Sequence, residues 1–303
     1  MGDRVNEFSW SRSRDATFQD CRRRYFYHYY GSWGGWAADA AAEVRQLYIL
    51  KQLASRQMWA GRVVHDAIEM ALHVLREGRT VPVEPFVADV VARMRGEWRS
   101  SRAARYRDDP RTLALYEHEY AVDVRPDVWQ ALKHNVVTCL RNFFRLPLLD
   151  RVRATAPEHW SIEHWSKVFD FEGTPVWIAP DFGFWDADGR LTLVDWKTGA
   201  SDADAIAFQL GCYALYAREV LDVEPARVEL LEVNLREPMV TPLPWDDGRL
   251  DAVRDQLRLS IRSMRAYLLD PVANVARLED FERTEELRIC RRCNFRVVCR
   301  PAL

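Results

Sequence analysis

The sequence predicts an α/β fold with a helical insertion, and two observations support this. Helical periodicity prevails up to about residue 158, and from Trp160 the apolar residues recur with the period of two that is typical of strands. The chain of 303 residues, of which 48% are hydrophobic, can bury a sizeable core. Because neither an internal repeat nor a low-complexity linker divides the sequence, we expect one compact unit.

The first half of the chain is expected to be helical. A first helix is predicted from about Phe18 to Tyr30, where glycines then break the pattern. A second helix is predicted from about Arg56 to Glu77, because apolar residues recur at helical spacing and Gly78 supplies a stop. Further helices with polar joints are expected over residues 84–150.

The second half is expected to form a sheet flanked by helices. The predicted strands cover about 160–169, 175–185, 190–197, 227–235 and 239–243. Alternating residues and turn sequences such as Glu172-Gly173 support these strands. A helix from about Asp202 to Val220 separates the third strand from the fourth, and an amphipathic helix from Asp247 to Leu269 ends before Pro271.

Charge and composition narrow the class of protein. The net charge of −2 argues neither for nor against nucleic acid as a partner. No apolar run approaches the length of a bilayer and residues 1–20 are polar and Arg-rich, so we expect no membrane partner, no secretory leader and a cytoplasmic location. Arginines cluster at residues 22–24 and 93–107, where they either contact phosphates or form solvated helix faces.

Four of the six cysteines gather at the two ends of the sequence. Cys21 lies in the first segment, and Cys290-x2-Cys293-x5-Cys299 lies in the last. Such a run suits a soft metal, and four thiolates can hold either a 4Fe–4S cluster or a structural zinc ion. The spacing does not distinguish between these two. A disulfide pair and a set of unrelated buried cysteines are the alternatives.

Two acidic residues are expected to meet on neighbouring strands. Asp181 follows Pro180, and fourteen residues later Asp195-Trp196-Lys197 ends an apolar strand. Alternation puts Asp195 and Lys197 on one face, and a hairpin brings Asp181 beside Asp195. Converging carboxylates suit Mg²⁺ or Mn²⁺, and the lysine, one of only four in the chain, could orient a water for phosphodiester cleavage. The alternative is a surface ion pair.

Two helices carry polar pairs whose spacing of four residues puts each pair on one helix face. His65 and Glu69 form the first pair, and Gln209 and Tyr213 form the second. An imidazole is a suitable third ligand for Mn²⁺ at a carboxylate site. The alternative interpretation is that all four side chains are structural.

Taken in order, these motifs resemble those of one family. Four of them match the RecB-like branch of the PD-(D/E)XK nucleases, namely Gly61-x3-His65-x3-Glu69, Pro180-Asp181, Asp195-x-Lys197 and Gln209-x3-Tyr213. The stretch Ser11-x-Ser13 to Tyr25 and the C-terminal cysteines resemble its iron–sulfur subset, which includes CRISPR-adaptation exonucleases and AddB-type recombination nucleases. Two departures are an Asp in place of Glu in the D-x-K motif and a helical stretch, 80–158, that is longer than in minimal members.

The resemblance implies a restriction-endonuclease-like core, in which helices flank a mixed sheet. It also implies a 4Fe–4S cluster, a structural staple that joins the N- and C-terminal segments through Cys21, Cys290, Cys293 and Cys299. On this basis residues 1–55 carry the first cluster cysteine and 56–158 carry the His65 motif. Residues 159–245 form the nuclease core, and 246–303 hold the last helix and the cluster-binding segment.

The same resemblance assigns roles at the site. The divalent metal, Mg²⁺ or Mn²⁺, would be bound by His65, Asp181, Asp195 and the backbone carbonyl of Trp196. Lys197 would position the attacking water. Gln209 and Tyr213 would contact the substrate strand or brace the site.

The implied function is that of a metal-dependent deoxyribonuclease, an exonuclease acting on single-stranded DNA or frayed ends. Its partners would be DNA with free ends and a helicase, recombination or integrase protein. Two alternatives are a catalytically idle DNA-binding or scaffold subunit and a zinc-stabilised interaction module. The presence of every acidic and lysine position of the motifs counts against the idle subunit.

Overall fold

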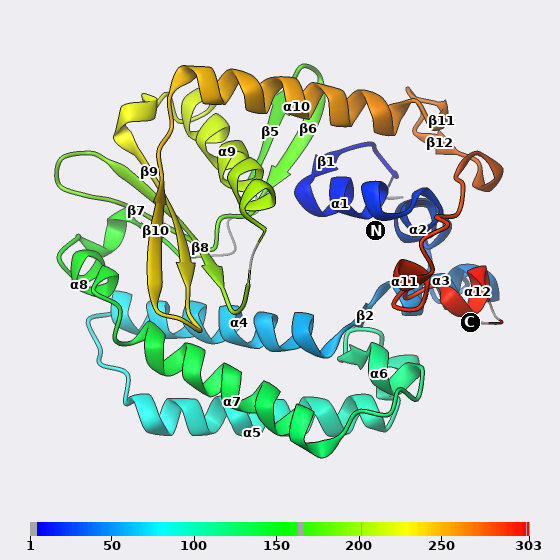
Figure 1. Cartoon of the computed structure of the whole chain (residues 1–303), viewed down its shortest axis with the longest axis horizontal. Coiled ribbons are helices and arrows are strands. Elements are labelled where there is room, and N and C mark those ends of the chain that lie inside the picture. The colour runs from blue at the N-terminus through cyan, green and yellow to red at the C-terminus, as the bar shows by residue number, and fades with distance from the viewer. Residues whose placement is uncertain (1–4, 163–166, 201, 301, 303) are drawn as a thin grey trace.

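The computed structural model describes residues 5–162, 167–200, 202–300 and 302 of the chain. Strands lie in its centre with helices above and below them, and segments from the two ends of the chain lie next to each other (Figure 1). A backbone hydrogen bond of 2.9 Å from Arg23 N to Glu282 O joins these two segments. The expected mixed α/β architecture is confirmed.

The larger sheet has five strands in the order β10-β9-β8-β7-β4. Their bounds are β4 Trp160–Ser161, β7 Phe182–Trp185, β8 Leu191–Lys197, β9 Val228–Asn234 and β10 Met239–Leu243. Strand β8 pairs in parallel with β9 and antiparallel with β7, so the sheet is mixed. The parallel pair needs a crossover, which helix α9 (Ala203–Glu219) supplies.

Helices cover both faces of this sheet, and β8 shows why. On one face, Val194 and Trp196 pack in a core with helices α4 (Arg56–Arg76), α5 (Val83–Arg102) and α7 (Pro126–Phe143). On the other face, Leu191 and Leu193 pack in a core with α9 and α10 (Asp247–Arg265). A strand that is buried on both faces is expected to be mainly apolar, as β8 is before Asp195 except at Thr192.

The expected strands 160–169 and 175–185 are wrong as single strands. The first divides into β4 and β5 (Lys167–Phe171), and residues 163–166 lie outside the described residues. The second divides into β6 (Thr174–Ile178) and β7, which belong to different sheets, because β6 pairs with β5 and with β1 (Trp10–Ser11). Pro180 has no N–H to donate to a ladder, so the chain leaves one sheet there and enters the other.

The expected helix from Phe18 to Tyr30 is also wrong as one helix. It is formed by α1 (Arg12–Asp20), α2 (Arg22–Phe26) and a π-helical turn at Tyr27–Gly31. Between α1 and α2, Cys21 is extended, with φ −166° and ψ 119°. The break makes Cys21 the N-cap of α2 and turns its thiol toward the Arg24 N–H, at 3.5 Å.

The longer predicted helices are confirmed, and side-chain caps explain where three of them begin. Ser55, Asp202 and Asp246 accept hydrogen bonds from backbone N–H groups in the first turns of α4, α9 and α10. Helix α3 (Ala42–Lys51) was not expected, and α10 ends at Arg265 rather than near Leu269. The short elements are α6 Tyr116–Glu119, α8 Leu148–Arg153, α11 Leu287–Cys290, α12 Arg296–Cys299, β2 Leu53–Ala54, β3 Ala114–Leu115, β11 Leu268–Asp270 and β12 Val275–Ala276.

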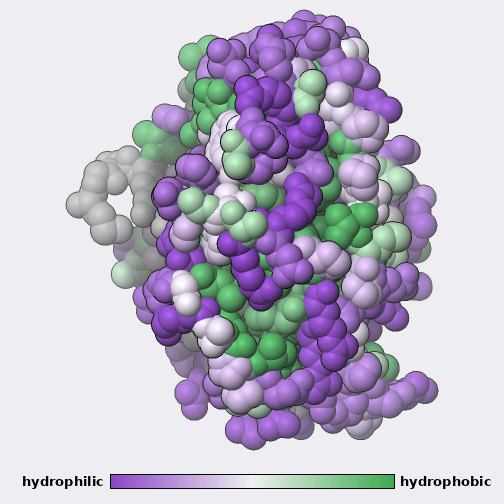
Figure 2. Space-filling model, turned by 90° about the vertical axis from the view of Figure 1, so that its left-hand side faces the viewer, coloured by the Kyte–Doolittle hydropathy of each residue, from purple (hydrophilic) through white to green (hydrophobic). Residues whose placement is uncertain are grey.

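The surface is mainly hydrophilic on the face that carries α8 and the ends of the sheet, where apolar side chains emerge only in separate patches (Figure 2). Among the described residues, no helix has both the length and the apolar character needed to cross a membrane.

Candidate active site

The end of strand β8 brings Asp195 and Lys197 together. Both lie on the face toward α9, as the alternation predicts, and Lys197 Nζ lies 2.6 Å from Asp195 Oδ2. The Asp195 side chain is 3% exposed, whereas that of Lys197 is 24% exposed. The interpretation as a surface ion pair is therefore wrong, because the carboxylate is buried and the lysine side chain is only partly exposed.

Asp181 lies beside this pair, at the point where the chain passes from β6 to β7. Its Oδ2 accepts a hydrogen bond of 2.7 Å from the Trp196 N–H, and its backbone N–H donates to Val194 O at 3.2 Å. Its other carboxylate oxygen, Oδ1, lies 2.9 Å from His65 Nδ1. Asp181 thus links the end of β8 to helix α4.

His65 reaches the sheet because α4 passes close to the end of β8 at Gly61. A Cβ atom on Gly61 would lie 3.6 Å from Thr198 Oγ1, and His65 follows one turn later on the same helix face. Glu69 continues that face, and its Oε1 lies 3.9 Å from His73 Nε2. The structure brings His65 to Asp181.

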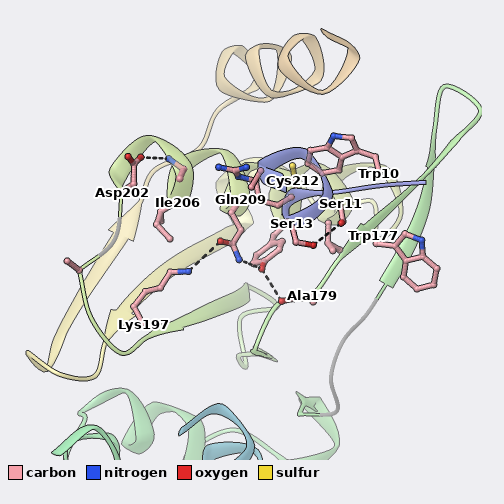
Figure 3. Close-up of a pocket in the computed structure, with 16 residues that line it drawn as sticks. Trp10, Ser11, Ser13, Trp177, Ala179, Lys197, Asp202, Ile206, Gln209 and Cys212 are labelled. Carbon is pink, nitrogen blue, oxygen red and sulfur yellow. Dashed lines mark hydrogen bonds between the residues drawn. The ribbon is translucent and has the colours of Figure 1, made fainter. Parts of the chain in front are cut away.

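Gln209 and Tyr213 approach Asp195 from α9. Gln209 Nε2 donates to Asp195 Oδ1 at 2.8 Å, and its Oε1 lies 3.4 Å from Lys197 Nζ. The Tyr213 hydroxyl lies 2.8 Å from Gln209 Nε2 and donates to the backbone carbonyl of Ala179 at 3.0 Å. Figure 3 shows Lys197 and Gln209 pointing toward each other, and Gln209 bound through the tyrosine to Ala179.

Burial and mutual repulsion alter the titration of this cluster. Burial, and then the negative charge of Asp181, raise the pKa of Asp195 to about 6, although Lys197 acts in the opposite direction. Burial lowers the pKa of His65, but the hydrogen bond to Asp181 and the two carboxylate charges outweigh it, so the pKa is raised. Burial, followed by the charges of Asp195 and Asp181, raises the pKa of Tyr213 well above its usual range. In each of these three residues, the negative charge of a neighbouring carboxylate contributes to the raised pKa.

The donors suit a hard divalent cation. Asp195 Oδ2 is buried, and the Lys197 ammonium group lies 2.6 Å from it. A carboxylate oxygen of this kind can serve as a ligand to Mg²⁺ or Mn²⁺. As they stand, the described residues include no group of three or more His, Cys, Asp or Glu side chains arranged to hold a metal ion. The physical reason is that His65 and Asp181 bind each other, and Asp195 binds Gln209.

A cavity of about 670 Å³ opens beside the cluster. Lys197, Gln209 and Tyr213 form one wall, and the beginning of α1 forms another. Figure 3 shows Ser11 and Ser13 on the α1 wall and Trp177 at the outer edge, where 44% of that residue is exposed. Sequence reasoning missed Trp177, because its place at the cavity depends on β6 pairing with β1, where Ser11 lies opposite Trp177.

The four terminal cysteines line one smaller cavity, of about 20 Å³, with Arg24, Arg283, Arg296 and Arg300 also in its wall. All of these cysteines are free thiols, so the disulfide alternative is not present. Burial raises the pKa of Cys293 to about 11, and the neighbouring Cys21 and Cys299 raise it further, against the effect of the Phe295 N–H and Arg24. Cysteine thiols are the residue type that binds a soft metal group, but as they stand these four are not among any group of three or more described residues arranged to hold a metal ion.

Comparison of the sequence with family models places the chain in a known family. The model of the PD-(D/E)XK nuclease superfamily matches residues 9–300. The chain belongs to the PD-(D/E)XK nuclease superfamily. Members are nucleases that generally use Mg²⁺ or Mn²⁺, and the match includes every residue of the cluster around Asp195 as well as the four terminal cysteines. A comparison with curated proteins found no match.

Proposed function

We propose that this protein is a metal-dependent deoxyribonuclease of the RecB-like branch, which removes nucleotides from single-stranded DNA or frayed ends. The observation that carries the proposal is the convergence of Asp181, Asp195 and Lys197 beside an open cavity. Membership of the superfamily implies a nuclease that binds DNA. The choice of DNA ends as substrate is the further step that we propose.

In this proposal Asp181, Asp195, His65 and the Trp196 carbonyl hold the metal, which supplies positive charge to the scissile phosphate. The Lys197 ammonium group is the positively charged group of the cluster that contacts a carboxylate, and Lys197 lines the cavity. It orients the attacking water and stabilises charge that develops on a phosphate oxygen. Gln209 is half-buried and binds Asp195 Oδ1, so it fixes the orientation of that carboxylate, whose other oxygen lies beside Lys197.

The cavity suits a single strand. Trp177 at its edge offers an exposed ring on which an unpaired base can stack, and Arg12 and Lys197 in its wall can pair with phosphates. Ser11, the N-cap of α1, and Ser13 line the same wall. A strand that ran from Trp177 to Lys197 would present one phosphate to the carboxylate cluster.

We also propose that the four terminal cysteines hold a 4Fe–4S cluster as a structural element. Support comes from their position around one cavity, from the four arginines that offset the negative charge of thiolates, and from the resemblance of the N- and C-terminal motifs to the iron–sulfur subset. Zinc is the competing occupant. Iron analysis and visible absorption of freshly purified protein distinguish the two, because zinc sites are colourless.

The experiment that tests the nuclease proposal is a digestion of end-labelled DNA with Mg²⁺ and with Mn²⁺. Single-stranded, duplex and closed circular substrates are compared, using the wild type, Asp181→Ala and a control, Asp188→Ala, which changes an exposed turn residue. We expect shortening of linear single strands and no cutting of closed circles. Cleavage of closed circles would make the protein an endonuclease, and cleavage by Asp181→Ala at the rate of the control would overturn the assignment.

A further inference from the structure

A second large cavity, of about 650 Å³, lies between α5 and α7 and is separate from the candidate active site. Its walls come from the C-terminal half of α5, the N-terminal half of α7 and the loop at residues 122–126 that precedes α7. None of the carboxylate cluster residues lines it. Its volume lies within the range of about 300 to 1,000 Å³ that is typical of small-ligand sites.

Three aromatic rings build one wall of this α5–α7 cavity. Trp98 meets His118 edge to face at 5.2 Å between ring centroids, and it meets Trp129 at 6.1 Å. His118 lies 5.9 Å from Trp129, so the three rings form one group. The buried Ser101 hydroxyl holds the group in place, because it lies 2.9 Å from His118 Nδ1 and accepts a hydrogen bond of 2.9 Å from Leu115 N–H. The wall is half-buried and fixed before any ligand arrives.

Cations converge on the same cavity from two helices. Arg95, Arg99 and Arg102 share one face of α5, and Lys133 lines the cavity from α7. In the part of the chain that the structure describes, none of these four forms an ion pair with a carboxylate. The Arg102 guanidinium instead lies 5.2 Å from the centre of the Trp98 ring.

Three arginines near the cavity but outside its lining do have carboxylate partners. Arg107 pairs with Glu119 at 2.8 Å, Arg111 with Asp109 at 2.9 Å, and Arg125 with Asp127 at 2.7 Å. Asp123 is the one carboxylate among the described residues of the cavity lining. The lining therefore holds four cations and one carboxylate around an aromatic wall. The excess of positive charge points to an anionic ligand with a flat ring.

We propose that the α5–α7 cavity binds one nucleotide, with its base against the Trp98 and Trp129 rings and its phosphate on Arg99 and Arg102. A nucleotide is the common biological ligand that joins an aromatic ring to a phosphate, and both arginine and tryptophan stack on bases. The base must be unpaired. A base that stacks on the aromatic wall occupies the wall in place of the neighbouring base on which it would stack in a duplex.

The nucleotide belongs to the DNA strand, an assignment that rests on the proposed function. Two helices connect this cavity to the catalytic cluster. Asn135 of α7 donates to the carbonyl of Thr198, just after β8, at 3.1 Å, and Trp129 lies six residues earlier on that helix. In α4, Trp59 of the cavity lies six residues before His65. Six residues of helix span about 9 Å, so a strand leaving the active site reaches the cavity within a few nucleotides.

The test measures binding rather than cleavage. Full-length Asp181→Ala protein without divalent metal is titrated with an oligothymidylate of about 12 nucleotides carrying one 2-aminopurine, whose fluorescence falls on stacking. In a parallel titration, free thymidine monophosphate competes for the same protein. The variants are Trp129→Ala, Trp129→Phe and Arg99→Ala/Arg102→Ala. The matched controls are Trp33→Ala, at another partly exposed tryptophan, and Arg111→Ala/Arg125→Ala, which removes two nearby paired arginines.

We expect Trp129→Ala to weaken binding about tenfold or more and Trp129→Phe to restore most of it, because stacking on one base carries this effect. In the Arg99→Ala/Arg102→Ala variant, the slope of log affinity against log salt concentration should become shallower by about 0.7 for each phosphate that the protein no longer neutralises. The control pair should leave that slope unchanged. Unfolding temperatures close to that of the parent protein would separate these effects from misfolding.

The outcomes decide between sources of the nucleotide. Loss of oligonucleotide binding without competition by thymidine monophosphate supports a subsite for the DNA strand, whereas full competition supports a site for a free nucleotide. Binding that matches the controls in both cavity variants overturns the proposal, and a protein segment would then be the occupant to consider. Because cleavage is not measured, failure of the nuclease assignment would appear in the digestion of labelled DNA and leave this result standing.

Discussion

The carboxylate cluster and the cysteine cavity both gather residues from distant parts of the chain, but they are held together differently. His65 and Asp181 are 116 residues apart and lie 2.9 Å from each other, and Asp195 is bound by Gln209 at 2.8 Å. The thiols have only weak partners, such as Phe295 N–H at 3.4 Å from Cys293. The protein alone therefore orients the first site. In our proposal, the stability of the second site would depend on the metal group that the thiols hold.

The largest effect is expected from breaking the carboxylate cluster. Asp181→Ala and Lys197→Ala should each reduce the cleavage rate on the order of 100-fold or more, because each removes a positioned charge at the reacting phosphate. Their unfolding temperatures should change little, since both side chains are partly exposed, at 21% and 24%. Rates are measured on end-labelled single-stranded DNA. A variant with wild-type activity would show that its residue lies outside the reaction.

The second prediction tests whether the stability of the fold depends on a metal group held by the four terminal cysteines. Cys21 precedes Cys290 by 269 residues, so a metal group that joins them closes nearly the whole chain into a loop and restricts the unfolded state. We expect Cys21→Ala and Cys293→Ala to give colourless, poorly soluble protein with weakened nuclease activity. Iron content and unfolding temperature are the measurements.

Cys139 and Cys212 are the matched controls for this prediction. Both are buried in helices, α7 and α9, and burial raises the pKa of Cys139 to about 11 and that of Cys212 to about 12. They are isolated structural thiols, so Cys139→Ala and Cys212→Ala should keep the iron content of the wild type. If Cys21→Ala kept its iron, or if Cys139→Ala lost it, the proposed ligand set would be wrong.

A third prediction separates metal binding from substrate binding at His65. A lost ligand first weakens the affinity for the metal. His65→Ala should therefore lose about tenfold or more activity under limiting Mn²⁺, and much of that loss should disappear at saturating Mn²⁺. Initial rates across a Mn²⁺ titration provide the measurement. An equal loss at every concentration would instead indicate that His65 positions Asp181 or the substrate.

The smallest effect concerns His28, which packs against Phe295 near the cysteine cavity at 6.3 Å between ring centroids. Burial, and then the charges of Lys51, Arg24 and Arg14, lower the pKa of His28 from 6.5 to about 3. Below pH 6.5 His28 is protonated in the unfolded chain, whereas in the folded chain it stays neutral down to about pH 3. The free energy of unfolding should thus fall through this window by at most about 1.4 kcal/mol per pH unit.

His28→Gln removes this contribution. Denaturant unfolding of the wild type and of the variant between pH 7 and pH 4 measures it, and the difference between the two proteins should shrink or reverse as the pH falls. Parallel curves at every pH would mean that His28 titrates alike in the folded and unfolded chains.

Much of the candidate site follows from local spacing. Alternation predicts that Asp195 and Lys197 share a face, and a helical spacing of four predicts that Gln209 and Tyr213 do, and in the structure each pair is in contact. The contact between His65 and Asp181 does not follow from spacing, because it depends on how α4 packs on the sheet. The resemblance to a family supplied that part of the prediction.

What the sequence does not reveal is where the chain changes direction. A period of two continues across Pro180, so it cannot show that β6 and β7 belong to different sheets. Helical periodicity likewise continues across Cys21, where a single extended residue separates two helices. In the sequence, the arginines of residues 93–107 gave only a weak indication of the α5–α7 cavity, because Trp129, which completes its aromatic wall, lies on another helix.

The burial of strand β8 predicts how the protein responds to heating. The strand lies between β7 and β9 and is buried from Leu191 to Trp196, so its amide hydrogens can exchange with deuterated solvent only when the whole molecule unfolds. Asp195 stands in this most protected strand rather than on a loop. Heating should consequently leave the Asp195 carboxylate ordered until the cooperative transition, so loss of the proposed activity and global unfolding should follow a single curve.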